Sequence, residues 1–276
     1  MTACPPANTM PDSPAIELRD VSLSFEDKRV LSRVSLLLPL GQTLVLFGVT
    51  GSGKSVLLKV ILGLIKPDEG RVLIQGKDLV PLGEELLGPI RQQMGIVFQE
   101  GALFDSLSVF ENVAFRLREE HWDEGAIDRR VREVLSFVEM DAAIEKMPAE
   151  LSGGMRRRVA IARAIASEPC IMLYDSPTGG LDPVTSHTIN VLVVKLRDVQ
   201  HVTSVVVTHR LQDAVMLVKY GYSPKRQTAI PREQLEFAHQ PTPTRFVVMR
   251  DGEVYFHGSA EEFTRTSDPY LQKFLP

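Results

Sequence analysis

Residues 48–55 combine three glycines with a lysine and two serines, in the order Gly48, Val49, Thr50, Gly51, Ser52, Gly53, Lys54 and Ser55. Glycines let successive backbone N–H groups turn inward around an anion, because no Cβ blocks the approach. At this spacing the lysine reaches the β- and γ-phosphates of a nucleotide, and the hydroxyl of the serine after it ligates magnesium. The segment therefore predicts an ATP site of the P-loop type, with a plain glycine turn as the alternative.

Asp175, which ends the apolar run 171–174, is a second candidate ligand for magnesium. An acid at the tip of a buried strand helps to hold magnesium at the edge of a P-loop. Buried strands also end in aspartate simply to form a turn, which is the alternative. With the P-loop upstream, we expect Ser55 and Asp175 to share the metal.

A second glycine-containing segment, residues 151–155, precedes the helical run 156–166. Ser152 is placed to cap that helix, and exposed N–H groups at a helix N-terminus attract anions. Because residues 48–55 already serve the chain's own ATP, we expect Ser152, Gly153 and Gly154 to address the γ-phosphate held by another subunit. A helix cap without a ligand is the alternative.

The elements that must position these motifs alternate short apolar runs with amphipathic stretches, which predicts a parallel sheet covered by helices. The unbroken apolar run 43–47 predicts a strand buried on both faces, leading into the P-loop and a helix over 55–64. Other predicted elements are strands at 16–25, 30–38, 71–74, 95–98, 171–174 and 203–207, a turn at 26–28, helices within 108–140 and a hairpin at 246–257. The segment 219–244 holds four prolines and scattered charge, so it is interpreted as a loose insertion loop.

The bulk composition argues against several classes of protein. The chain has 276 residues, a formal net charge of −4 and a sequence pI of about 5.9, which does not favour a nucleic-acid partner. Two cysteines, Cys4 and Cys170, favour a reducing compartment over a disulfide framework. No run reaches the roughly 18 to 20 apolar residues that span a bilayer, and residues 1–13 read as a disordered leader without signal-peptide features. We therefore expect a cytosolic protein that acts at a membrane only through a partner.

Over about residues 14–260 the motifs resemble the ATPases of the ABC transporter family, chiefly through the P-loop, Asp175 and the segment 151–155. The resemblance implies an α/β fold with a P-loop NTPase (RecA-like) core, an antiparallel β subdomain and an inserted α-helical subdomain at about residues 100–165. It places the ATPase domain at residues 14–258, with the insertion loop at about 219–244 and a C-terminal tail at 259–276. ATP and Mg2+ are the ligands it implies.

The resemblance also implies roles for four residues that fall in the family's order. Phe25 takes the position of an aromatic that stacks on adenine, with a core aromatic as the alternative. Gln99 corresponds to a glutamine that reaches the magnesium and the attacking water. Asp182 lies in the loop that contacts the partner subunit, and His209 takes the position that contacts the γ-phosphate.

Within the family, the segment 101–115, Met155 and residues 268–271 are similar to the Mla/Mce lipid-transport ATPases. That similarity implies an energy-coupling subunit for phospholipid or another hydrophobic cargo, peripheral on the cytoplasmic face of the inner membrane. It implies an integral-membrane permease, a second ATPase subunit in a homodimer or heterodimer, and an Mce-domain substrate-binding protein as partners. Three apolar residues are candidates for a dock on the permease, with the subdomain core as the alternative for each: Phe104, Leu107 and Phe110.

One residue departs from the family's pattern where catalysis is concerned. After Asp175 the family has a glutamate that polarises the attacking water, whereas this chain has Ser176. A serine does not act as a base near neutral pH without an activating partner, and removing a general base costs about 10²- to 10⁴-fold in rate. We therefore expect ATP binding with slow hydrolysis, unless Glu100 or His209 substitutes. The alternative is a degenerate subunit that acts as an ATP-dependent switch or as the inactive half of a heterodimer.

Two charged features remain beside these motifs. Arg210 stands where the family commonly has an aspartate after the histidine, and the run 156–158 of three arginines is interpreted as a solvated helix face.

A soluble ATPase of DNA repair or translation is a third functional class. Such proteins carry a long coiled coil or a second cassette, and the sequence shows neither.

Overall fold

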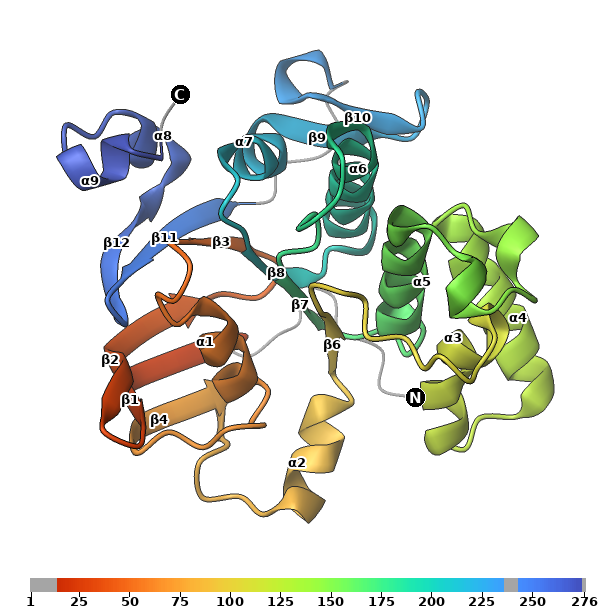
Figure 1. The fold of residues 1–276 in the computed structure, drawn as a ribbon, viewed down its shortest axis with the longest axis horizontal. Helices are drawn as coiled ribbons and strands as arrows, with labels where there is room; N and C mark the ends of the chain where they lie inside the picture. Colours follow the sequence, from red (N-terminus) through yellow and green to blue (C-terminus); the bar gives the residue numbers. More distant parts are fainter. Residues whose placement is uncertain (1–13, 236–242, 275–276) are drawn as a thin grey trace.

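A computed structural model describes residues 14–235 and 243–274; the predicted leader at 1–13 lies outside the described residues. Its central sheet has the strand order β12-β11-β3-β8-β7-β6, in which β12 is antiparallel to β11 and the other neighbours are parallel. Helices cover this sheet (Figure 1), which confirms the predicted α/β class. The strands are β3 (Thr43–Phe47), β6 (Met94–Val97), β7 (Ile171–Asp175), β8 (Thr203–Val207), β11 (Thr244–Arg250) and β12 (Glu253–Ser259).

The central strands of this sheet explain where polar chemistry can occur. Every residue of β3 and of β8 is buried, as expected for apolar strands covered on both faces. Because β3, β8 and β7 run parallel and in register, their carboxyl ends meet at one edge of the sheet. That edge carries the start of the P-loop, Asp175 and the segment Thr208-His209.

A second, antiparallel sheet has the order β2-β1-β4-β5. Its strands are β1 (Ile16–Phe25), β2 (Lys28–Leu38), β4 (Glu69–Ile74) and β5 (Lys77–Asp78). The predicted turn joins β1 to β2, and Glu26 adopts a positive φ of 52° there. Helix α1 (Lys54–Ile61) lies beside this sheet (Figure 1) and shares a hydrophobic core with β1 and β3, which fixes the helix that follows the P-loop.

Helices α3 (Val109–Glu119), α4 (Glu124–Phe137) and α5 (Gly153–Ile165) group on one side of the central sheet (Figure 1). Their starts follow capping chemistry: Ser108 and Glu111 form a capping box on α3, and the Asp123 carboxylate accepts two backbone N–H groups of α4. The helical prediction for residues 108–140 is confirmed, with its break near residue 121. Helix α2 (Glu84–Arg91), with the short 3₁₀ helices η1 (Asp141–Ala143) and η2 (Pro148–Glu150), had no counterpart in the sequence predictions.

The interpretation of residues 219–244 as a loose loop is wrong for residues 220–235. After α7 (Leu211–Lys219) the chain forms a hairpin of β9 (Tyr220–Ser223) and β10 (Thr228–Pro231), then the 3₁₀ helix η3 (Arg232–Gln234). The hairpin packs against α6 (Pro183–Gln200) (Figure 1). Residues 236–242 lie outside the described residues.

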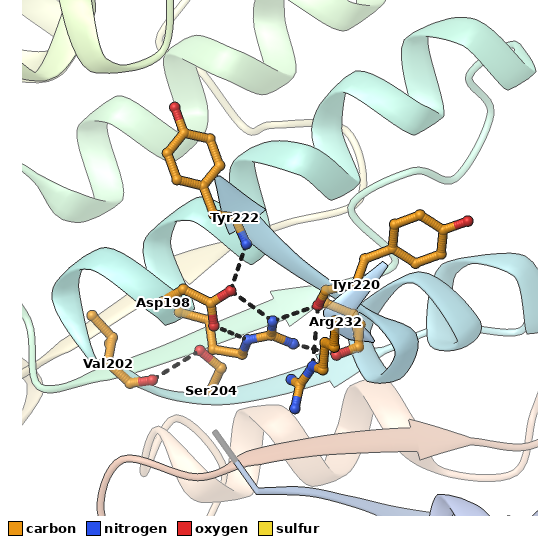
Figure 2. Close-up of polar contacts among 8 residues, drawn as sticks. Asp198, Val202, Ser204, Tyr220, Tyr222 and Arg232 are labelled. Carbon is orange, nitrogen blue, oxygen red and sulfur yellow. Dashed lines mark hydrogen bonds and ion pairs between the residues drawn. The ribbon is translucent and has the colours of Figure 1, made fainter. Parts of the chain in front are cut away.

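Polar contacts at the end of α6 hold this inserted hairpin in place. The fully buried Arg197 forms a 2.7 Å ion pair with Asp198 and donates a hydrogen bond to the Tyr220 carbonyl (2.8 Å). The Asp198 carboxylate in turn accepts the Tyr222 N–H at 2.8 Å (Figure 2). Arg232 also donates to the Tyr220 carbonyl (3.3 Å), and burial beside Arg197 lowers its pKa to about 10. The hairpin is anchored by backbone contacts to the charged pair Arg197–Asp198. Because such contacts leave only weak hydrophobic periodicity in the sequence, the pattern of residues 220–231 does not predict two strands.

The C-terminal tail predicted at 259–276 is also ordered where it is described. Helices α8 (Ala260–Thr264) and α9 (Pro269–Gln272) follow β12. Phe263 stacks on Phe246 (ring centroids 5.2 Å apart) and on Phe47 (6.0 Å). Phe47 is the last residue before the P-loop, so α8 braces the strand that carries the candidate site.

Candidate functional site

A cavity of about 350 Å³ opens at the carboxyl edge of the central sheet. It gathers residues from four motifs that are far apart in the sequence. The lining residues are Val30, Thr50, Gly51, Gly53, Lys54, Ser55, Val56, Gln99, Ser176, Val207 and His209. The structure thus brings together the predicted P-loop, the glutamine, the serine after Asp175 and the histidine.

The P-loop backbone requires glycine at two positions. Gly48 has a φ of 149°, and a Cβ added there would lie 2.4 Å from the Met249 carbonyl oxygen. Gly53 has a φ of 95°, and its Cβ would lie 2.8 Å from the Val30 carbonyl oxygen. Any larger residue would force the loop away from the neighbouring strands. These two glycines therefore set the loop's curvature.

Lys54 lies inside the loop, with only 8% of its surface exposed. Its ammonium donates to the carbonyls of Gly48 (2.8 Å) and Val49 (2.7 Å) and to the Ser52 hydroxyl (3.2 Å). Burial lowers the pKa of Lys54, and the negative charge of Asp175 partly opposes that change. A desolvated cation inside a ring of backbone groups is suited to an incoming phosphate, which supplies the anionic partner that neutral carbonyls cannot.

Ser55 and Asp175 lie close enough to share a cation. The Ser55 hydroxyl donates a 3.0 Å hydrogen bond to the Asp175 carboxylate. Hydroxyl and carboxylate oxygens are the ligands that magnesium takes beside phosphate oxygens. The residues present therefore fit a magnesium ion at this edge of the P-loop.

Ser176 begins a tight turn at the wall of the cavity. It has a positive φ of 47°, its N–H donates to the Val207 carbonyl (3.0 Å), and its carbonyl accepts the Gly179 N–H (2.8 Å). The Gln99 side chain lies against this turn, since a Cβ on Gly179 would be 3.3 Å from Gln99 Cγ. Among the cavity-lining residues in the described part of the chain, none is an aspartate or glutamate.

Asp213, which the sequence analysis missed, joins the turn at Ser176 to the strand before His209. Its buried carboxylate accepts hydrogen bonds from the Thr178 hydroxyl (2.6 Å), the Thr208 hydroxyl (2.9 Å) and the Asn190 amide (2.8 Å). No spacing rule marks a single aspartate on a helix as buried. The signal exists only in the fold, which brings α7, β8 and the turn together.

Arg210, to which the sequence alone assigns no role, bridges the same region. Its guanidinium donates to the Ser186 hydroxyl (2.7 Å) on α6 and to the Thr178 carbonyl (3.4 Å). The residue therefore ties the His209 segment to the start of α6.

Asp175 and the P-loop residues Gly48, Val49 and Ser52 adjoin the lining residues without lining the cavity themselves. Three further groups of predicted site residues lie outside the cavity. Phe25 ends β1 with 45% of its surface exposed. Ser152 caps α5 as predicted, and Gly154 packs so closely on Thr185 that a Cβ would lie 2.3 Å from its methyl group. Asp182 caps α6, and hydrogen bonds from Thr185 and Val184 lower its pKa. Contact of Phe25, residues 152–154 and Asp182 with a nucleotide stays a prediction.

The interpretation of the three arginines 156–158 as a solvated face is wrong for Arg157. Its side chain is only 4% exposed, and it donates hydrogen bonds to the Phe98 and Gly179 carbonyls. Arg156 donates instead to the Leu151 carbonyl, and Arg158 contacts Glu139.

Comparison with known proteins places the chain in a family. The sequence profile described as "ABC transporter" matches residues 31–179. The intermembrane phospholipid transport system ATP-binding protein MlaF of Haemophilus influenzae is 34% identical over 255 residues, covering 91% of this chain and 97% of that protein. The chloroplastic protein TRIGALACTOSYLDIACYLGLYCEROL 3 of Arabidopsis thaliana is 37% identical over 269 residues, covering 94% of this chain and 72% of that protein.

Solved structures agree with these sequence matches. The dimeric ATP-binding cassette MJ0796, in a post-hydrolysis state bound to ADP and Pi, superposes with a TM-score of 0.74 at 31% identity, covering 88% of this chain and 98% of the other. The cbiO1 protein of Clostridium perfringens, part of the cbiONQ transporter complex, gives a TM-score of 0.76 at 25% identity, covering 92% of both chains. Since the profile, the relatives and the fold agree with the P-loop, Asp175 and the capped helix α5, this chain belongs to the ABC transporter family of ATPases.

Proposed function

We propose that the chain is the ATP-binding, energy-coupling subunit of an ABC transporter and closes as a dimer around ATP and Mg2+. The observation that carries the proposal is the cavity that gathers Lys54, Ser55 and His209 at one edge of the sheet. A dimer is supported by the position of Ser152–Gly154 outside the chain's own cavity, and by the dimeric form of MJ0796. In such a dimer each ATP contacts the P-loop of one chain and the start of α5 of the other.

In this proposal the chain's own residues bind and orient the phosphates. The P-loop N–H groups and Lys54 hold the β- and γ-phosphates, while Phe25 stacks on adenine. Ser55, Asp175 and Gln99 would hold magnesium, which neutralises phosphate charge when bound. Asp182, at the start of α6, would face the partner chain.

Hydrolysis is proposed to be slow, because Ser176 supplies no base and no aspartate or glutamate lines the cavity among the residues that the structure describes. Of the two candidate substitutes, His209 lines the cavity, whereas Glu100 is exposed and does not. We therefore propose His209 as the group that accepts the proton from the attacking water.

The proposed cargo is a phospholipid or another hydrophobic molecule, since MlaF is named for intermembrane phospholipid transport. No helix in the described part of the chain is both long and apolar enough to cross a membrane. The proposed partners are an integral-membrane permease, a second ATPase subunit and an Mce-domain protein, which would hold the chain at the cytoplasmic face of the inner membrane. Of the three residues expected to form a dock, Phe104 is exposed, whereas Phe110 packs against the hydrophobic core. Phe104 and Phe115, the second of which the sequence did not single out, are each 42% exposed with ring centroids 4.7 Å apart and form an apolar surface suited to the permease.

A second candidate function is an ATP-dependent switch, or the inactive half of a heterodimer. Ser176 favours it, because binding and closure need no base. The transporter subunit and the switch use the same ATP-binding residues, so the rate of ATP hydrolysis is what distinguishes them.

Steady-state ATP hydrolysis by the chain, alone and with its permease, tests both candidates beside the variants Ser176→Glu and His209→Ala. We expect slow turnover that Ser176→Glu raises by about 10²- to 10⁴-fold and that His209→Ala abolishes. A native chain that already turns over as fast as Ser176→Glu would contradict the missing base. Native turnover that stays undetectable with the permease, while ATP still binds, would favour the switch. Failure of the native chain to bind ATP would overturn the whole proposal.

A further inference from the structure

Arg157 lies one helical turn after Gly153 on α5, yet it is buried while its neighbours reach the surface. Only 4% of its side chain is exposed. Burial lowers the pKa of its guanidinium, and the charge of Glu100 opposes that change. Burying an arginine is costly unless its donors are satisfied; here both Nη atoms donate hydrogen bonds, while Nε finds no partner among the described residues. The hydrogen-bond acceptors of Arg157 therefore indicate its structural role.

The guanidinium of Arg157 links two separate walls of the ATP cavity. Nη1 donates a 2.6 Å hydrogen bond to the carbonyl of Phe98, the residue before Gln99. Nη2 donates a 3.3 Å hydrogen bond to the carbonyl of Gly179, in the turn that begins at Ser176. Both acceptors are backbone groups, so the contact fixes the path of the two segments.

Gln99 itself contacts the same turn from the other direction. Its side chain lies against Gly179: a Cβ added to that glycine would lie 3.3 Å from the Gln99 side chain. Gly179 is thus held between the Arg157 guanidinium and the Gln99 side chain. Removing the guanidinium would free the turn and the strand end together.

Arg163, two turns further along α5, provides an informative comparison. It donates to the carbonyls of Gly101 (2.9 Å) and Ala102 (2.8 Å), where Ala102 is held at a positive φ of 49°. A non-glycine residue in that conformation persists only where its surroundings fix it. Helix α5 therefore holds the segment around Gln99 on both sides, through Arg157 at Phe98 and through Arg163 at residues 101–102. Of these two arginines only Arg157 also reaches the turn at Ser176.

The start of the same helix is the segment Ser152–Gly154, which packs on Thr185 at the start of α6. Arg157 stands within one turn of it on a rigid helix. A displacement of the start of α5 would therefore reach Phe98 and Gly179 through the guanidinium.

We infer that Arg157 is a positioning residue that couples Ser152–Gly154, which faces the partner's ATP, to Gln99 and the Ser176 turn at the chain's own ATP. This inference rests on the proposed ATP-dependent dimer. Arg157 needs no contact with nucleotide in this role. It sets the position of Gln99 relative to the Ser176 turn when the dimer closes.

Arg157→Met tests the coupling, since it keeps the aliphatic length and removes both hydrogen bonds. Arg157→Lys is the conservative variant, since it keeps the positive charge. Its single ammonium cannot reach both carbonyls as the planar guanidinium does, so only part of the contact is kept. Arg158→Met is the matched control: it removes a neighbouring arginine whose contacts, to Val138 and Glu139, lie within the helical region. Thermal unfolding of all three variants reports whether each one folds.

Two measurements on the full chain separate positioning from stability. One is the affinity of the monomer for a fluorescent ATP analogue with magnesium, and the other is the concentration of chain needed for ATP-dependent dimerisation. For Arg157→Met we expect analogue affinity within about twofold of native and dimerisation weakened by about tenfold or more, since hydrogen bonds from a charged group are lost. Arg157→Lys should fall between native and Arg157→Met, and Arg158→Met should match the native chain.

Hydrogen exchange gives a readout that needs no dimer. Amides of residues 98–101 and 176–181 should exchange faster in folded Arg157→Met than in the native chain, and at native rates in Arg158→Met. Dimerisation and exchange that are native-like in Arg157→Met would overturn the coupling while leaving the proposed function standing. A native chain that binds no ATP would instead overturn the proposed function.

Discussion

The Ser55 hydroxyl donates a 3.0 Å hydrogen bond to the Asp175 carboxylate across 120 residues of sequence. Ser55 is the second residue of α1, and Asp175 ends β7, two strands away from β3 in the sheet. The bond marks where a divalent cation would sit, because each group would exchange its present partner for the metal. Magnesium should therefore compete with this contact directly.

Asp175→Asn should weaken ATP binding only in the presence of magnesium. Loss of one charged ligand corresponds to about 10- to 100-fold in affinity, while Lys54 and the loop still hold the phosphates. Titrations of ATP with magnesium and with a chelator measure the two affinities. Lys54→Ala is the comparison, since it should lower both affinities; equal losses with and without magnesium in Asp175→Asn would contradict the assignment.

Asp213→Ala should destabilise the protein. The change leaves the Thr178 and Thr208 hydroxyls and the Asn190 amide without their common acceptor in a buried site. Unsatisfied buried groups cost about 1–3 kcal/mol in the free energy of unfolding, which urea denaturation measures. Asp128→Ala is the control, because Asp128 contacts Arg132 on an exposed helix face and should change stability less. Equal losses in both variants would show that the cluster around Asp213 adds nothing.

The sequence predicted the parts of the fold that depend on local chemistry. The P-loop, the buried strands β3 and β8 and the cap at Ser152 follow from residue types at fixed spacing, and they appear at nearly the predicted bounds. The Asp213 cluster, the burial of Arg157 and the anchored hairpin depend on contacts between distant segments. A single charged residue carries no local sign of such contacts, so the charge run 156–158 predicts a solvated face for Arg157 too.

The capping box of α3 should contribute a pH-dependent part of stability. Hydrogen bonds from the Ser108 backbone N–H and then its hydroxyl lower the pKa of Glu111 below its ordinary 4.5. Because the folded pKa lies below the unfolded one, this contribution is full above about pH 4.5 and is lost as the pH falls through the folded pKa. Glu111→Gln keeps an acceptor without the charge. The difference in unfolding free energy between native and Glu111→Gln should therefore shrink between about pH 7 and about pH 3; a constant difference would mean that the charge adds nothing.

Asp198→Ala should destabilise the inserted hairpin through two losses at once. It leaves the guanidinium of Arg197, whose side chain is 1% exposed, without its ion-pair partner, and it removes the acceptor of the Tyr222 N–H. Breaking one partner of a buried pair typically costs about 3–5 kcal/mol. Urea denaturation measures the change in the unfolding free energy.

The double variant Arg197→Met with Asp198→Ala distinguishes charge burial from hairpin anchoring. Removing both charges relieves the unpaired guanidinium, so the double variant should be more stable than Asp198→Ala alone. It still lacks the Tyr220 and Tyr222 contacts, so residues 220–231 should exchange backbone hydrogens faster than in the native chain. Additive losses from Arg197→Met and Asp198→Ala would contradict a coupled pair. Native exchange in the hairpin would show that packing on α6, and not this pair, holds it in place.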